Sequence, residues 1–271
     1  MIRMSLKTIL ASPATTAFFK GRVQVPKVDS PLLVRVSRGE GSPQLVGSGF
    51  DYALRFGLQA RFPCLARQTA GERGAELGFS FGHSPDDVSN ALLEAHNAIE
   101  VARKGAAGTE LTSDVAAACL RLAAFESIYR SGRPDGFTRH PAATEVAELQ
   151  ALFEIVPWEE FTPEERIHLN PTFGEGSRAV GGADADLVLD DTMIEVKTVA
   201  RSRLSLAIIR QLLCYAILAR RFGLDGDDSS TEITELGVYF ARAGSLVRAS
   251  LAECLLSDEE EVIQFLLEER H

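Results

Sequence analysis

The residues best suited to chemistry are two acids and a lysine in the second half of the chain: Asp186, Glu195 and Lys197. The stretch 193–199 alternates well enough to be a strand, and a period of two places Glu195 and Lys197 on one face of a sheet. The stretch 187–191 is predicted to be a short apolar strand followed by an acidic turn. Folding the chain back at that turn brings Asp186 near Glu195.

Two converging carboxylates supply the oxygen ligands that a hard divalent cation such as Mg²⁺ or Mn²⁺ prefers. The backbone carbonyl of Val196 would add a third oxygen, and the ammonium of Lys197 suits an anionic substrate. The pattern therefore predicts a divalent-metal site beside a lysine. The alternative interpretation is a solvated hairpin that carries one surface ion pair.

A second pattern lies in the apolar stretch 202–221, which is predicted to be a helix. Gln211 and Tyr215 stand four positions apart and therefore share one face of that helix. The succession Asp, Glu-x-Lys and Gln-x-x-x-Tyr resembles the PD-(D/E)xK nuclease superfamily, and within it the RecB-like branch that includes phage lambda exonuclease.

The resemblance implies a role for each residue of the hairpin. Asp186, Glu195 and the Val196 carbonyl would hold the cation, and Lys197 would orient the attacking water and stabilise charge on phosphorus. The implied activity is Mg²⁺-dependent hydrolysis of DNA phosphodiester bonds.

Other residues are candidates for contact with the nucleic acid. Gln211, with Tyr215 behind it, would position the strand or order Lys197. Arg210 stands beside Gln211, and Arg178 lies in a glycine-rich stretch, 174–182, that is predicted to be a loop.

The first core helix of RecB-like nucleases often begins with Gly-x-x-x-His or with an acid in place of His. Gly47 and Asp51 match this pattern in a predicted helix at 45–56, ended by Gly57, so Asp51 is a further candidate metal ligand. The alternative is an acid in a first helical turn, favoured there by the helix dipole. Three acids farther along compete with Asp51 for the same role: Glu126, Glu145 and Glu148.

The resemblance implies an α/β fold with a restriction-endonuclease-like core, a mixed central sheet flanked by helices in the order αβββαβ. Periodicity predicts the same order: a helix at 45–56, strands at 167–173, 187–189 and 193–199, a helix at 202–221 and a strand at 233–241. A strand at 245–251 and a helix at 258–268 capped by Ser257 follow.

The rest of the chain is divided into two parts. Residues 1–45 form an N-terminal segment with a strand at 31–37 and a loop, and residues 46–271 form the core. Helices predicted at about 84–105, 113–129 and 142–155 make up a helical insertion at about 84–157.

Composition limits the possible partners. The chain of 271 residues has a net charge of -10, which argues against a broad basic face for DNA but is compatible with a confined, metal-dependent cleft. No apolar run approaches the roughly 18 residues of a membrane span, so no membrane partner and a cytoplasmic location are expected. The four cysteines have no close spacing, and therefore no iron–sulphur cluster is expected.

The sequence thus predicts a metal-dependent nuclease with DNA as its partner, in repair, restriction or phage defence. The choice between exonuclease and endonuclease, and between DNA and RNA, stays open. The rival hypothesis is a catalytically silent subunit of the same fold that binds a protein partner or nucleic-acid ends.

Overall fold

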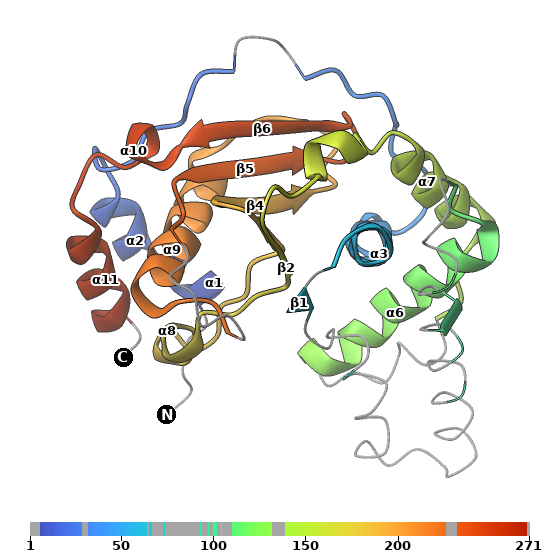
Figure 1. Cartoon of the computed structure of the whole chain (residues 1–271), viewed down its shortest axis with the longest axis horizontal. Helices are drawn as coiled ribbons and strands as arrows, with labels where there is room; N and C mark the ends of the chain where they lie inside the picture. Colours follow the sequence, from blue (N-terminus) through green and yellow to red (C-terminus); the bar gives the residue numbers. More distant parts are fainter. Residues whose placement is uncertain are drawn as a thin grey trace.

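The computed structural model describes residues 6–28, 32–63, 65–66, 73, 93, 97, 100–101, 104, 110–131, 139–225 and 232–269. Its centre is a six-stranded sheet in which the strands follow sequence order from β1 to β6 (Figure 1). The strands are β1 (Leu65–Ala66), β2 (Ile167–Leu169), β3 (Leu187–Leu189), β4 (Thr192–Lys197), β5 (Glu235–Phe240) and β6 (Ser245–Ser250). The predicted α/β class with a mixed sheet flanked by helices is confirmed.

Strand direction determines where a crossover is needed. The pairs β1–β2 and β4–β5 are parallel, and the other neighbouring strands are antiparallel. A parallel pair needs a crossover connection, and helix α9 (Leu206–Phe222) supplies it between β4 and β5.

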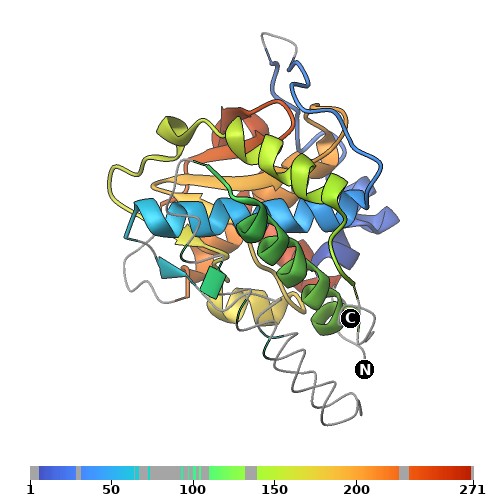
Figure 2. The ribbon, with the colours of Figure 1, turned by 90° about the vertical axis from the view of Figure 1, so that its right-hand side faces the viewer.

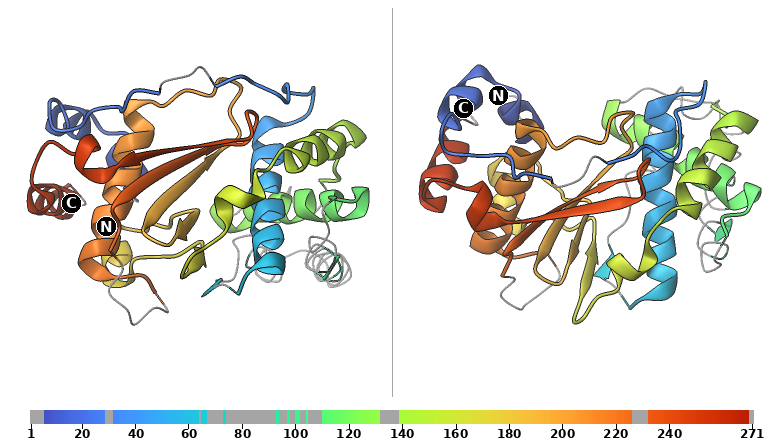
Figure 3. Two further views of the ribbon diagram at one scale, coloured as in Figure 1. Left: turned by 45° about the horizontal axis from the view of Figure 1, so that its top comes forward. Right: turned by 90° about the horizontal axis from the view of Figure 1, so that it is seen from above.

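The two faces of the sheet bury separate hydrophobic cores. Helices α3 (Pro43–Arg61), α6 (Ser113–Ser131) and α7 (Ala143–Glu154) share one core with Ile194 and Val196 of β4 (Figure 2). Helix α9 covers the opposite face, where Met193 is buried (Figure 3). This alternation places Glu195 and Lys197 on the α9 face, as the strand period predicts.

The first and last parts of the chain pack together beside α9. Helices α1 (Leu6–Leu10) and α2 (Pro13–Phe18) join α10 (Leu251–Cys254) and α11 (Glu259–Glu268) in the core of the α9 face. The rings of Phe18 and Phe265 stack with centroids 4.1 Å apart, and Gln24 N donates to the Cys254 carbonyl at 3.0 Å. The N-terminal segment is therefore part of the fold.

Helix α3 is longer than its pattern predicts. Ser42 caps it, since the Ser42 hydroxyl accepts from Leu45 N at 3.3 Å, and Pro43 occupies the first turn. The predicted end at Gly57 is wrong, since the helix continues to Arg61. Gly57 instead allows the helix to pack closely on another residue, because a Cβ there would lie 2.6 Å from the Trp158 ring.

Three other sequence predictions need correction. Residues 32–37 form no strand; they are a segment without regular structure in which Arg35 N and Val36 N both donate to the Arg242 carbonyl. The stretch predicted as a loop contains helix α8 (Gly174–Ala179). Asp258, not Ser257, caps α11, with its carboxylate accepting from Glu260 N at 2.7 Å.

The helices of the predicted insertion are placed only in part. Those predicted at 113–129 and 142–155 correspond to α6 and α7, which pack on α3 in the core of its face. The one predicted at 84–105 lies largely outside the described residues. None of the helices in the described ranges is long and apolar enough to cross a membrane.

Candidate active site

The carboxyl end of β4 brings the predicted catalytic residues together. Lys197 is the last residue of the strand, and its ammonium donates to Glu195 Oε1 at 2.5 Å. Glu195 is buried, with 6% of its surface exposed, while Lys197 is half-buried. The pair therefore lies at the edge of the core, within reach of solvent.

Asp186 reaches the same place from the neighbouring strand. It immediately precedes β3, which is antiparallel to β4 with Leu187 opposite Ile194. Asp186 Oδ2 accepts from Val196 N at 2.7 Å. The hairpin thus fixes the Asp186 carboxylate to the backbone of Val196, the residue next to Glu195.

Gln211 and Tyr215 approach from α9. The Gln211 amide nitrogen lies 3.1 Å from both Glu195 Oε1 and the Tyr215 hydroxyl. Glu195 Oε1 therefore accepts from two donors, Lys197 and Gln211. Tyr215 packs against the Phe173 ring with centroids 5.5 Å apart, and burial, with Glu195 adding to it, raises its pKa, so the hydroxyl stays protonated.

Asp51 is the third carboxylate, supplied by α3 from the other side of the sheet. The Asp51 side chain is exposed, but it lies in a concave part of the surface at the end of β4. Burial there raises the pKa of Asp51 well above its usual value, and Asp186, Glu126 and Glu195 raise it further while Lys197 lowers it. Asp51 therefore belongs electrostatically to the same cluster.

The three competing acids fall into two groups. Glu126 accepts from the Tyr52 hydroxyl at 3.4 Å and lies near enough to Asp51 to raise its pKa. Glu145 and Glu148 on α7 instead bind the chain before α3. Glu145 accepts from Ser42 N and Ala142 N, and Glu148 accepts from Gly39 N, each at 2.9 Å.

The cluster holds more carboxyl groups than cationic side chains. Burial, together with the nearby Glu195 carboxylate, raises the pKa of Asp186 to about 8, although the Val196 N–H opposes this. Burial alone would lower the pKa of Lys197, but the charge and hydrogen bond of Glu195, together with Asp186 and Asp51, outweigh it and the pKa rises. One ammonium thus faces several carboxylates, an arrangement that a bound cation would relieve.

The donor set fits magnesium better than a metal that needs a complete protein cage. Among the described residues, no three His, Cys, Asp or Glu side chains are already grouped as metal ligands. Magnesium commonly keeps several waters and takes only one or two carboxylates from the protein. Asp186 and Glu195, with the Val196 carbonyl and Asp51 nearby, match that requirement.

The predicted DNA-binding arginines lie apart from this cluster. Arg178 is exposed on the last turn of α8, and Arg210 Nη1 lies 3.4 Å from the Thr16 hydroxyl of α2. Of the three residues predicted to contact the nucleic acid, the structure therefore brings only Gln211 to the carboxylates.

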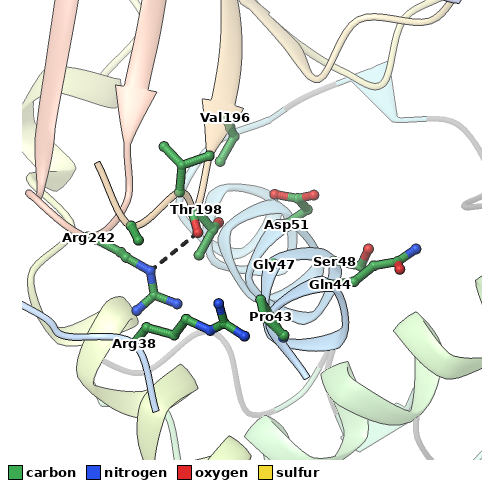
Figure 4. A pocket seen from close by; sticks show the side chains of 11 residues that line it. Arg38, Pro43, Gln44, Gly47, Ser48, Asp51, Val196, Thr198 and Arg242 are labelled. Carbon is green, nitrogen blue, oxygen red and sulfur yellow. Dashed lines mark hydrogen bonds between the residues drawn. The ribbon is translucent and has the colours of Figure 1, made fainter. Parts of the chain in front are cut away.

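A pocket of about 430 Å³ opens beside the cluster at the carboxyl end of β4 (Figure 4). Asp51 and Val196 line it together with Thr198, Arg38 and Arg242. The sequence offered a signal for Arg242, because it directly follows the strand predicted at 233–241, which is β5 and pairs with β4 in the structure. It offered none for Arg38, which reaches the pocket from a segment without regular structure.

Comparisons with family models, with curated proteins and with solved structures gave no match to this chain.

Proposed function

We propose that this protein is a divalent-metal-dependent nuclease of the PD-(D/E)xK type. The observation that supports this most is the convergence of Asp186, Glu195 and Lys197 at the end of one hairpin, with Gln211 and Tyr215 bound behind them. Five residue types in one sequence order and one place are hard to explain as a surface ion pair.

The arrangement of elements supports the same proposal. Helix α3, strands β2, β3 and β4, helix α9 and strand β5 occur in the αβββαβ order of a restriction-endonuclease-like core, with β1, α6 and α7 inserted between α3 and β2 and α8 inserted between β2 and β3. The carboxylates lie at the carboxyl end of β4, where open α/β sheets place their ligands.

Asp186, Glu195 and the Val196 carbonyl would hold the cation, with Asp51 facing it from α3. When bound, a divalent cation would polarise a phosphoryl oxygen and lower the pKa of a nearby water. This chemistry needs an anionic substrate at the strand end, which the Lys197 ammonium attracts.

The protein side chains would then position the metal ligands and stabilise the transition state. Lys197 would donate to a phosphoryl oxygen as negative charge develops there, an interaction stronger in the transition state than in the bound substrate. Gln211 would fix the Glu195 carboxylate through its hydrogen bond, and the buried Tyr215 would fix Gln211. The site is thus supported by an outer layer of hydrogen bonds.

The test is cleavage of supercoiled plasmid and of end-labelled linear duplex with Mg²⁺, Mn²⁺ or EDTA. We expect metal-dependent cleavage by the wild type and by Lys20→Ala, which removes an exposed lysine from the N-terminal segment, and strongly slowed cleavage by Lys197→Ala. The two substrates separate endonuclease from exonuclease activity. Binding without cleavage in every metal would overturn the proposal in favour of a silent binding subunit.

A further inference from the structure

The pocket beside the carboxylates has a basic end that the proposed mechanism does not use. Its lining runs from Asp51 and Val196 to two arginines, Arg38 and Arg242, whose side chains lie close to one another in Figure 4. A volume of about 430 Å³ lies within the range of small-molecule sites. An anionic group next to the scissile bond would find both cations there.

The two arginines differ in whether an ion pair neutralises their charge. Arg242 is 1% exposed and forms an ion pair with Glu148, and its Nε donates to the Thr198 carbonyl at 3.3 Å. Its charge is therefore compensated within the core. Arg38 is exposed and has no ion-pair partner among the described residues. Arg38 thus supplies the net positive charge of the pocket.

The backbone on both sides of Arg38 is fixed. Val36 N donates to the Arg242 carbonyl at 3.1 Å, and Gly39 N donates to Glu148 Oε2 at 2.9 Å. Ser42 N donates to Glu145 at 2.9 Å immediately before α3 begins. Since the segment is already ordered, a ligand held by Arg38 costs little conformational entropy.

The start of α3 also favours negative charge in the pocket. Pro43 and Gln44 of its first turn line the pocket, and the N-terminal end of a helix favours negative charge. The carboxylate cluster at the other end repels anions unless a cation is bound. An anion is therefore favoured at the Arg38 end, and only a ligand that spans both ends would link it to the metal site.

We propose that Arg38 binds a backbone phosphate of the nucleic-acid strand adjacent to the phosphate that is cleaved. This inference rests on the proposed nuclease function and specifies how the substrate strand crosses the site. The strand passes from the carboxylate cluster along the first turns of α3 into the pocket. A guanidinium suits this role because its planar donors match phosphate oxygens.

The test compares Arg38→Gln with Arg221→Gln, a matched removal of an exposed arginine at the last turn of α9. Binding of a labelled DNA duplex is measured in Ca²⁺ over a series of salt concentrations, with a 5′-phosphate or a 5′-hydroxyl end. We expect Arg38→Gln to weaken binding about tenfold and to reduce the slope of log K against log salt by about 1, equally for both ends. Arg221→Gln should match the wild type.

Three outcomes overturn the inference. An unchanged salt slope in Arg38→Gln, while the wild type cleaves DNA, would overturn this inference alone. A loss confined to the 5′-phosphorylated duplex would replace the internal phosphate with a strand end. Absence of both binding and cleavage by the wild type would instead remove the proposed function, and this inference with it.

Discussion

Two groups of buried acids in this molecule have opposite electrostatic environments. On α7, burial alone would raise the pKa of Glu145, but the N–H groups of Ala142 and Ser42 and the Arg139 guanidinium lower it. At the end of β4, burial and Glu195 raise the pKa of Asp186 to about 8. The α7 acids are matched by donors, whereas the strand-end acids face one another.

The difference separates acids that are neutralised by donors within the fold from acids whose charge the fold leaves uncompensated. Glu148 is fully engaged by the guanidinium of Arg242 and by Gly39 N. Asp186 accepts one backbone hydrogen bond and otherwise repels Glu195. Shifted pKa values of the second kind gather at functional sites, since the fold tolerates the cost where a ligand relieves it.

Replacing Lys197 should give the largest effect on the strand-end group. Lys197→Ala should lower turnover by about 100-fold or more, the scale of removing one donor to developing charge, while DNA and metal binding stay largely intact. The free energy of unfolding should fall as well, because the buried Glu195 carboxylate loses its counter-ion. Single-turnover cleavage and binding isotherms separate these effects, and full activity in folded Lys197→Ala would remove this hairpin as the active site.

Glu195→Ala should differ from Lys197→Ala in its metal dependence. Losing the carboxylate takes a ligand from the cation, so the metal concentration for half-maximal rate should rise as the rate falls. Excess Mn²⁺ should restore part of the activity. Metal titrations of the two variants measure this, and identical curves would contradict a ligand role for Glu195.

Glu148→Ala should give the largest effect on the α7 group, and the effect should be on stability. Removing one partner leaves the buried Arg242 guanidinium uncompensated, which costs about 3–5 kcal/mol. Glu154→Ala, an exposed acid on the same helix, is the control and should change stability by less than about 0.5 kcal/mol. Urea denaturation compares the two, and equal stabilities would erase the distinction between the two groups of acids.

Asp186→Asn should change stability in the opposite direction. A carboxyl whose folded pKa is raised contributes stability below its unfolded pKa and loses it as pH rises through the folded value, about 8 here. The amide cannot ionise and still accepts from Val196 N. Metal-free Asp186→Asn should therefore be more stable than the wild type at pH 9 and show no gain at pH 4.

That gain should come with a loss of nuclease activity at every pH. Thermal melts in EDTA at the two pH values measure the stability difference. A variant less stable than the wild type at pH 9 would show that the strand-end carboxylates do not repel one another.

The thiols should give the smallest effect. Burial raises the pKa of Cys119 beyond the usual range and that of Cys214 to about 12, so neither forms a thiolate at neutral pH. We expect the folded protein to be colourless and its activity to survive alkylation. Stoichiometric iron in the purified protein would contradict this.

Local pattern predicted the elements that carry the site, and long-range contacts determined what it missed. The hairpin around Asp186 and Glu195 follows from a period of two, and α9 follows from a helical stripe. Helix α8 was missed because its glycines predict a loop. In the structure Gly176 fits against the Phe222 ring, where a Cβ would lie 2.5 Å away, and Ser177 accepts from Phe173 N at 2.7 Å.

The pocket could not be predicted for a similar reason. Arg242 Nη1 reaches the Val36 carbonyl, at 3.4 Å, across a sequence separation of 206 residues. Nothing near Arg38 in the sequence indicates that its segment is held by α7 and by the end of β5. Residues with strong local periodicity were therefore predictable, and those positioned by distant partners were not.

The packing of the first residues against the last has a consequence for biosynthesis. Because Phe18 stacks on Phe265 and Leu256 N donates to the Arg22 carbonyl, these contacts of the N-terminal segment form only after the residues around α11 have been translated. Until then the nascent chain carries an apolar N-terminal segment, including Phe19, without these contacts. Such exposure favours aggregation and chaperone binding, so the yield of folded protein should depend on elongation rate more than the stability of the finished fold suggests.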